Sequence, residues 1–161
     1  MKVVRAVLGK ISAILACASG IIVVVLCIGL VVSLLTSVFF RYIVGQALSW
    51  PEEISLILFT WLVLLAGSLG VHEGFHVRLS IFTDRLPRSL RLILERLTTA
   101  AIGAFGVVLI YSGYDLVQRT AEHLTPTLRL PLDWLNFAAP VCGILICLHA
   151  LNALVQPGKE I

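Results

Sequence analysis

Four long apolar runs that contain no Asp, Glu, Lys or Arg dominate this sequence. They cover residues 11–40, 54–71, 97–114 and 134–156. An α-helix rises about 1.5 Å per residue and the hydrocarbon core of a bilayer is about 30 Å thick, so runs of this length can span it. The sequence therefore predicts an all-α integral membrane protein in which residues 1–161 form a single domain of four transmembrane helices.

The first run is longer than a span requires, so we expect its helix to tilt or to project from the bilayer. Basic residues precede it, as they do in a secretory signal peptide. The apolar part of a signal peptide is only about 7–15 residues long, however. We therefore interpret this run as an uncleaved first helix.

Charge is scarce and is placed around the runs. Only 13% of the residues are charged, against about 25% in soluble domains. The net charge of +3 would favour a nucleic-acid partner only if the basic residues shared one solvated face. Because they flank the apolar runs instead, we expect membrane lipids around this chain and no nucleic acid.

The basic residues are distributed unequally between the two ends of the predicted helices. Nine lie on the side of the chain termini: Lys2, Arg5, Lys10, Arg78, Arg85, Arg88, Arg91, Arg96 and Lys159. Three lie on the opposite side: Arg41, Arg119 and Arg129. Cytoplasmic connections carry the excess of Lys and Arg, so both termini are expected in the cytoplasm and the protein in the bacterial inner membrane.

The connection between the second and third runs predicts a basic amphipathic segment on the cytoplasmic side. Its apolar residues at helical spacing are Leu86, Leu90, Ile93, Leu94 and Leu97, and its basic residues include Arg78, Arg85, Arg88 and Arg91. We expect this segment to lie on, or enter, the anionic leaflet before the third span.

The first outer connection ends in a helix-start pattern. Ser49 can cap the second helix, and Glu52, three residues later, can complete a capping box. Glu53 adds a second carboxylate to the first turn, and Trp50 suits the membrane–water interface.

The second outer connection, residues 115–133, is the longest polar stretch. It carries Arg119, Glu122, Arg129 and Asp133. We expect this connection to meet a partner outside the membrane.

The residues inside the four runs argue against several functions. A self-sufficient exporter of charged solutes usually keeps a charged residue or a broken helix in the membrane, and the runs hold no Asp, Glu, Lys or Arg. The cysteines, Cys17, Cys27, Cys142 and Cys147, all lie inside runs and form no CxxC pair, which disfavours a disulfide-generating enzyme. We expect no catalytic, metal-binding or cofactor-binding residues and no enzymatic activity.

Three histidines leave one alternative open. His72 and His76 are four residues apart near the inner end of the second helix, and His149 lies toward the inner end of the fourth. One of the first two could hold haem b together with His149, as in a membrane oxidoreductase subunit. A further alternative is a small membrane protein that acts only in assembly.

Small residues and one central tryptophan predict close helix packing. Trp61 lies near the middle of the second run, although tryptophan prefers the interfaces. Pairs of small residues four apart allow helices to approach closely: Ala16 and Gly20, Gly29 and Ser33, Ala66 and Gly70, and Ala100 and Ala104.

Several short motifs, in order, resemble the small membrane subunit (DctQ type) of tripartite ATP-independent periplasmic (TRAP) transporters. They are Arg41-Tyr42, Trp50-Pro51-Glu52-Glu53, Trp61 with Ala66-Gly67, His76-Val77-Arg78, Leu86-Pro87, Thr125-Pro126, Leu130-Pro131 and Pro140. The resemblance covers about residues 41–140.

This resemblance implies a complex with a large membrane subunit and a periplasmic substrate-binding protein. The large subunit would hold the substrate and sodium sites, and the small subunit would enlarge the static scaffold. Trp61, Ala66 and Gly70 would then pack against the large subunit, and the charged residues of the second outer connection would help dock the binding protein. Organic acids taken up with sodium are the expected substrates.

The orientation predicted from the basic residues can be tested by thiol labelling in intact cells. With the native cysteines replaced, we expect Gly45→Cys and Thr127→Cys to react with an impermeant reagent from the periplasm, and Ser80→Cys and Ser89→Cys to stay unlabelled. Labelling of Ser80→Cys from outside would invert the topology.

Overall fold

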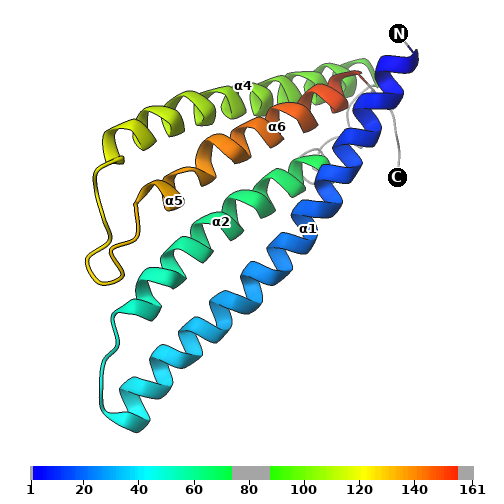
Figure 1. Ribbon diagram of the computed structural model, residues 1–161. Coiled ribbons are helices and arrows are strands. Elements are labelled where there is room, and N and C mark those ends of the chain that lie inside the picture. The colour runs from blue at the N-terminus through cyan, green and yellow to red at the C-terminus, as the bar shows by residue number, and fades with distance from the viewer. Residues whose placement is uncertain (1, 74–87, 156–161) are drawn as a thin grey trace.

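Four helices long and apolar enough to cross a membrane make up the computed structural model (Figure 1), which describes residues 2–73 and 88–155. The elements are α1 (Lys2–Phe39), a π-helical turn η1 (Phe40–Val44), α2 (Trp50–His72), α4 (Arg88–Thr120), the short α5 (Asp133–Asn136) and α6 (Ala138–Val155). The described residues contain no β-strand, only an isolated bridge between Leu124 and Pro131. The predicted all-α fold with four spanning helices is confirmed.

The helices form two antiparallel hairpins that lie side by side in one layer. α1 pairs with α2, α4 pairs with α6, and the hairpins meet where α6 packs on α2. The helices converge where α1 begins and α6 ends, which we call the terminal end, and spread toward the opposite side (Figure 1). We call that side the loop end, since it carries the α1–α2 and α4–α5 connections. The fold is thus an open layer and not a closed four-helix bundle.

The first helix continues beyond the predicted run before it ends in a special conformation. The π-helical turn follows Phe39, and Gly45 then adopts a left-handed φ of 74° while its N–H bonds the carbonyl of Phe40. A residue with a Cβ is strained at this φ. Ala47 is therefore a better labelling position than Gly45.

Small side chains line the contact between α1 and α2. Ser12, Ala16, Ser19 and Ser33 are buried and recur along α1 at spacings that approximate whole helical turns. A Cβ built on Gly29 would lie 3.4 Å from Cδ1 of Leu58. Residues without bulk at these positions let the two helices approach closely over much of their length.

The closest helix contact lies between α4 and α6 and uses glycines that the sequence analysis did not single out. A Cβ built on Gly143 would lie 2.7 Å from the carbonyl oxygen of Gly106 and 2.9 Å from the backbone nitrogen of Ile110. One built on Gly113 would lie 2.6 Å from Cδ of Pro140. The two backbones touch here, so only glycine fits.

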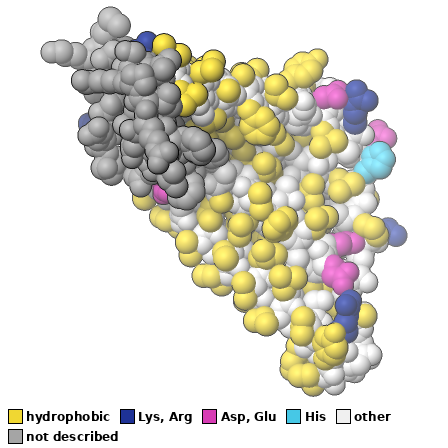
Figure 2. Space-filling view, turned by 180° about the vertical axis from the view of Figure 1, so that it is seen from behind, with side chains coloured by type: hydrophobic (Ala, Val, Ile, Leu, Met, Phe, Trp, Pro, Cys, Tyr) yellow, Lys and Arg dark blue, Asp and Glu magenta, His cyan; other side chains and the backbone are white. Residues whose placement is uncertain are grey.

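Many large apolar side chains of the described residues are exposed. The core consists of Leu65, Cys142 and Leu145, with partly buried side chains around it. Along α1, by contrast, Ile14 is 68% exposed and Val25 is 62% exposed. Figure 2 shows apolar side chains across the face, with acidic and basic side chains gathered along one edge. Exposed apolar surface of this extent indicates contact with lipid or with another membrane protein.

The predicted cytoplasmic basic segment is described only in part. Arg78 and Arg85 lie outside the described residues. Arg88 and Arg91 belong to the first turn of α4, which runs without a break to Thr120. The described part of the segment is therefore continuous with the third spanning helix.

The glycine contact gives a test of the fold with a matched control. We expect Gly143→Ala to destabilise the isolated chain by about 1–3 kcal/mol, because the added methyl group meets backbone atoms that cannot move aside. Gly67→Ala should be neutral or slightly stabilising, since a Cβ there would meet nothing within 4 Å. Thermal unfolding in detergent measures both, and equal unfolding temperatures would contradict the contact.

Candidate functional site

An ion pair joins α1 to α2 at the loop end. The guanidinium of Arg41, in the π-helical turn, lies 2.9 Å from a carboxylate oxygen of Glu52 in the first turn of α2. Both side chains are more than half exposed. Pairs of this kind contribute about 0–1 kcal/mol, so this one has little effect on stability.

Glu53, the next residue, binds the main chain of the other hairpin. Its Oε1 accepts a hydrogen bond from the N–H of Thr127 at 2.7 Å, and its Oε2 accepts one from the N–H of Leu128 at 2.9 Å. Both oxygens of one carboxylate are thus used on two successive backbone donors. Bonds to an ionised acceptor are about twice as strong as bonds between neutral groups.

The α4–α5 connection contains a compact turn with hydrogen bonds of its own. The N–H of Arg129 bonds the carbonyl of Thr125 at 3.2 Å, and the N–H of Leu130 bonds the Thr125 hydroxyl at 3.0 Å. Arg129 adopts a left-handed φ of 51°, which closes the turn. Pro126 has no N–H, and the donors of Thr127 and Leu128 at the tip bond the carboxylate of Glu53.

Two further side chains fix the elements around this turn. The amide of Asn136 in α5 donates to the Thr120 hydroxyl at the end of α4, at 2.7 Å. The buried hydroxyl of Ser33 in α1 donates to the carbonyl of Pro51 at 2.9 Å. The carboxylate of Glu53 therefore projects from a helix start that is itself held in place.

The predicted capping box is wrong. Ser49 occupies the N-cap position of α2, but its side chain makes no capping bond and its dihedral angles are helical. Pro51 at the start of the helix offers no N–H to a capping hydroxyl. Glu52 reaches Arg41 instead of turning back to Ser49.

Trp61 has a partner within the chain. Its indole N–H donates to the carbonyl of Trp134 at 2.7 Å, and its ring packs against the core. A partly buried tryptophan in an apolar span is stabilised by such an acceptor, which explains its place inside the span. Ala66 and Gly70 are half-buried on α2. That Trp61, Ala66 and Gly70 pack against a large subunit stays a prediction.

The four predicted docking residues lie at the loop end but do not form one cluster. Arg119 pairs with Asp115 on the same helix at 2.8 Å. Glu122 and Arg129 are exposed, whereas Oδ1 of Asp133 is buried and has no hydrogen-bond partner among the described residues. The sequence analysis missed Glu53 as the residue that shapes this region.

A buried polar cluster joins three helices at the terminal end. The Ser12 hydroxyl of α1 lies 3.0 Å from Nδ1 of His72 in α2 and 2.8 Å from Nδ1 of His149 in α6. Ser12 and His149 are each 2% exposed. One hydroxyl can donate to only one ring, so at least one of the two histidines carries a proton on Nδ1.

The histidine geometry does not fit a haem held by His72 and His149. The two ring centroids are 4.9 Å apart and both Nδ1 atoms converge on one hydroxyl. A haem that two histidines ligate needs both imidazoles to face the iron from opposite sides. His76, the other histidine of that hypothesis, lies outside the described residues.

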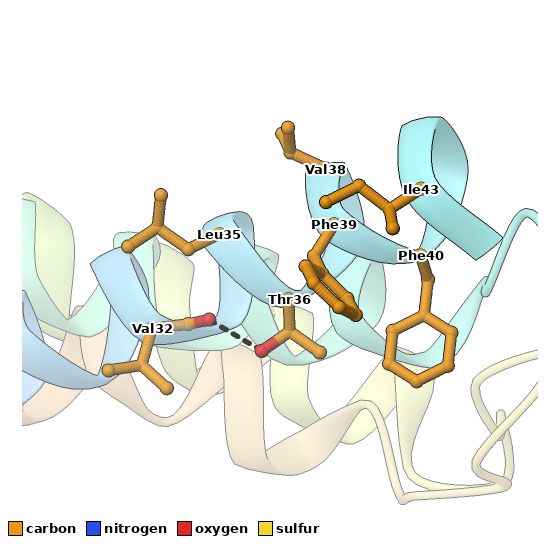
Figure 3. Close-up of a pocket in the computed structure, with 7 residues that line it drawn as sticks. All are labelled: Val32, Leu35, Thr36, Val38, Phe39, Phe40 and Ile43. Atoms are coloured by element: carbon orange, nitrogen blue, oxygen red, sulfur yellow. Dashed lines mark hydrogen bonds between the residues drawn. The ribbon is translucent and has the colours of Figure 1, made fainter.

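An open apolar groove of about 550 Å³ lies at the loop end of α1 (Figure 3). It is lined by Val32, Leu35, Thr36, Val38, Phe39, Phe40 and Ile43. The Thr36 hydroxyl bonds the carbonyl of Val32 in its own helix. A site for a polar substrate needs several convergent polar groups, so this groove is unsuited to one.

The family model for the DctQ component of tripartite ATP-independent periplasmic transporters matches residues 30–159 of the chain. Three curated relatives are similar to it. SiaQ, a sialic acid TRAP transporter small permease protein of Vibrio cholerae, is 28% identical over 71% of this chain and 66% of its own length.

DctQ, a C4-dicarboxylate TRAP transporter small permease protein of Rhodobacter capsulatus, is 28% identical over 67% of this chain and 48% of its own length. DctMQ, an isethionate TRAP transporter permease protein of Oleidesulfovibrio alaskensis, is 25% identical over 68% of this chain and 18% of its own length. The chain thus matches slightly less than two thirds of SiaQ and about half of the dicarboxylate relative.

The serine–histidine cluster predicts a specific loss of stability. Ser12→Ala removes two hydrogen bonds between helices, each of which contributes about 0.6 kcal/mol on average in membrane proteins. We therefore expect a loss of about 1–2 kcal/mol in unfolding experiments in mixed micelles. Ser68→Ala is the control, because this buried hydroxyl bonds only the carbonyl of Leu65 in its own helix. Equal stability of the two variants would contradict the bridging role of Ser12.

Proposed function

The chain belongs to the DctQ component family of tripartite ATP-independent periplasmic transporters, and from this we propose that it supports the scaffold of a large membrane subunit and helps dock a periplasmic binding protein. As a small permease subunit it is a multi-pass protein of the bacterial inner membrane and not an enzyme. We further propose that the complete transporter takes up an organic acid with sodium.

The open helix layer is the observation that supports a scaffold role. In the most apolar stretch of the first span, only 6% of the residues are buried by the rest of the described chain. The four apolar runs contain no Asp, Glu, Lys or Arg that could bind a charged solute. An open layer whose described residues expose this much apolar surface is suited to enlarge a neighbouring membrane protein.

One face of α2 favours contact with the large subunit. A Cβ built on Gly67 would meet nothing within 4 Å, so the surface of α2 is open at this glycine, next to the half-buried Ala66. Small residues on a helix surface let a partner helix approach closely. The match covers only 18% of the isethionate relative, which is a single long permease chain. This supports a close association of the present chain with a larger membrane protein.

The substrate class follows from the names of the relatives. Sialic acid, C4-dicarboxylates and isethionate are all organic acids. Sodium coupling is what the family resemblance implies. Since the groove on the first helix is lined by apolar side chains apart from Thr36, we propose that the choice of substrate rests with the partners of this chain.

The loop end is proposed to face the periplasm and meet the binding protein. The unequal distribution of basic residues supports this orientation. Glu122 and Arg129 are exposed there, and Arg119 is exposed although it pairs with Asp115. Charges at the rim of an interface mainly alter the rate of association and its salt dependence.

Uptake by the complete transporter in proteoliposomes tests the proposal. With the large subunit, the binding protein and an inward sodium gradient, we expect uptake of an organic acid. Glu122→Lys and Arg129→Glu should lower it several-fold at limiting binding protein and low salt, and the defect should shrink as binding protein is added.

The amount of assembled membrane complex serves as the control and should not change. Wild-type uptake by both variants under limiting conditions would remove these residues from the docking surface. Uptake that is indifferent to the sodium gradient would contradict the proposed coupling.

A further inference from the structure

Two neighbouring carboxylates at the start of α2 bind in different directions. Glu52 pairs with Arg41 in η1, which follows α1 in the same hairpin. Glu53 instead binds the α4–α5 turn of the second hairpin. The contact of Glu53 with Leu128 joins residues 75 positions apart. The first turn of α2 thus links both connections of the loop end.

The chemistry of the turn makes Glu53 hard to replace. The two N–H groups of Thr127 and Leu128 need two acceptors at 2.7 and 2.9 Å, and a carboxylate provides both. A glutamine has one carbonyl oxygen, and its NH₂ group would face the second N–H. The carboxamide therefore leaves one donor of the turn without its partner.

The turn held by Glu53 carries a mixed basic and apolar surface. Exposed side chains on and beside it are Leu124, Leu128, Arg129, Leu130 and Trp134. Arg and aromatic residues are enriched in protein interfaces, where a fixed backbone reduces the entropy lost on binding.

We propose that Glu53 is a positioning residue that holds the α4–α5 turn in the conformation to which the periplasmic binding protein docks. This inference rests on the proposed docking function of the loop end. Glu53 acts through the main chain of Thr127 and Leu128, and the exposed side chains of the turn make the contact. Its loss therefore weakens docking without altering the membrane part of the transporter.

The test compares Glu53→Gln with Glu52→Gln in the assembled transporter. The two substitutions remove the same charge from adjacent positions, but only the first affects the turn. For Glu53→Gln we expect faster amide hydrogen exchange at Thr127 and Leu128. We also expect the half-saturating concentration of binding protein to rise about three- to thirtyfold.

The uptake rate at saturating binding protein should stay near wild type for both variants, and Glu52→Gln should match wild type in every measurement. If Glu53→Gln lowers the amount of assembled complex, Glu53→Asp is measured in its place. This substitution keeps the charge, but its side chain is too short to reach both donors. Either variant is expected to loosen the turn.

Three results would overturn the inference or its premise. Unchanged hydrogen exchange in Glu53→Gln would show that the carboxylate does not hold the turn. Faster hydrogen exchange in Glu53→Gln with an unchanged half-saturating concentration of binding protein would show that the turn is not needed for docking. In that case a docking defect in Glu122→Lys would still support the docking function of the loop end. Wild-type docking by the Glu122, Arg129 and Glu53 variants together would refute the docking function itself.

Discussion

The absence of water from the bilayer is the constraint on which this structure depends. Each backbone N–H and C=O inside the hydrocarbon must be satisfied within the protein, and helices do this without help from other segments. Several polar side chains that remain inside bond to nearby backbone carbonyls, as Trp61 does with the carbonyl of Trp134 and Ser33 with that of Pro51. Among the described residues, the ion pairs of Arg41 with Glu52 and of Arg119 with Asp115 lie at the loop end.

The same constraint explains why so much of the fold could be predicted from the sequence. Charge-free runs and their length determine four spanning helices, and no long-range contact is needed to see them. Exact packing is different, because it depends on which residues meet. The contact of Gly106 with Gly143 joins helices that no local pattern pairs, and the sequence analysis singled out Ala100 and Ala104 instead.

The candidate site was predictable only in outline. The motif with Glu52 and Glu53 attracted attention, but it was interpreted as a local cap because a capping box depends on residues three apart. The true partner of Glu53 is a pair of backbone N–H groups, which leave no trace in a sequence because every residue except proline has one. The convergence of His72 and His149 on Ser12 was hidden for a related reason, since it joins three separate helices.

The division of the layer into two hairpins has a consequence for how the protein is made. Each hairpin has its own close internal contact, α1 with α2 and α4 with α6, so each can enter the bilayer and pair as soon as its two helices have left the ribosome. The carboxylate of Glu53 must wait, because Thr127 is synthesised 74 residues later. The bond between them therefore cannot form until the α4–α5 connection has been synthesised, and the loop end acquires its final shape only after that.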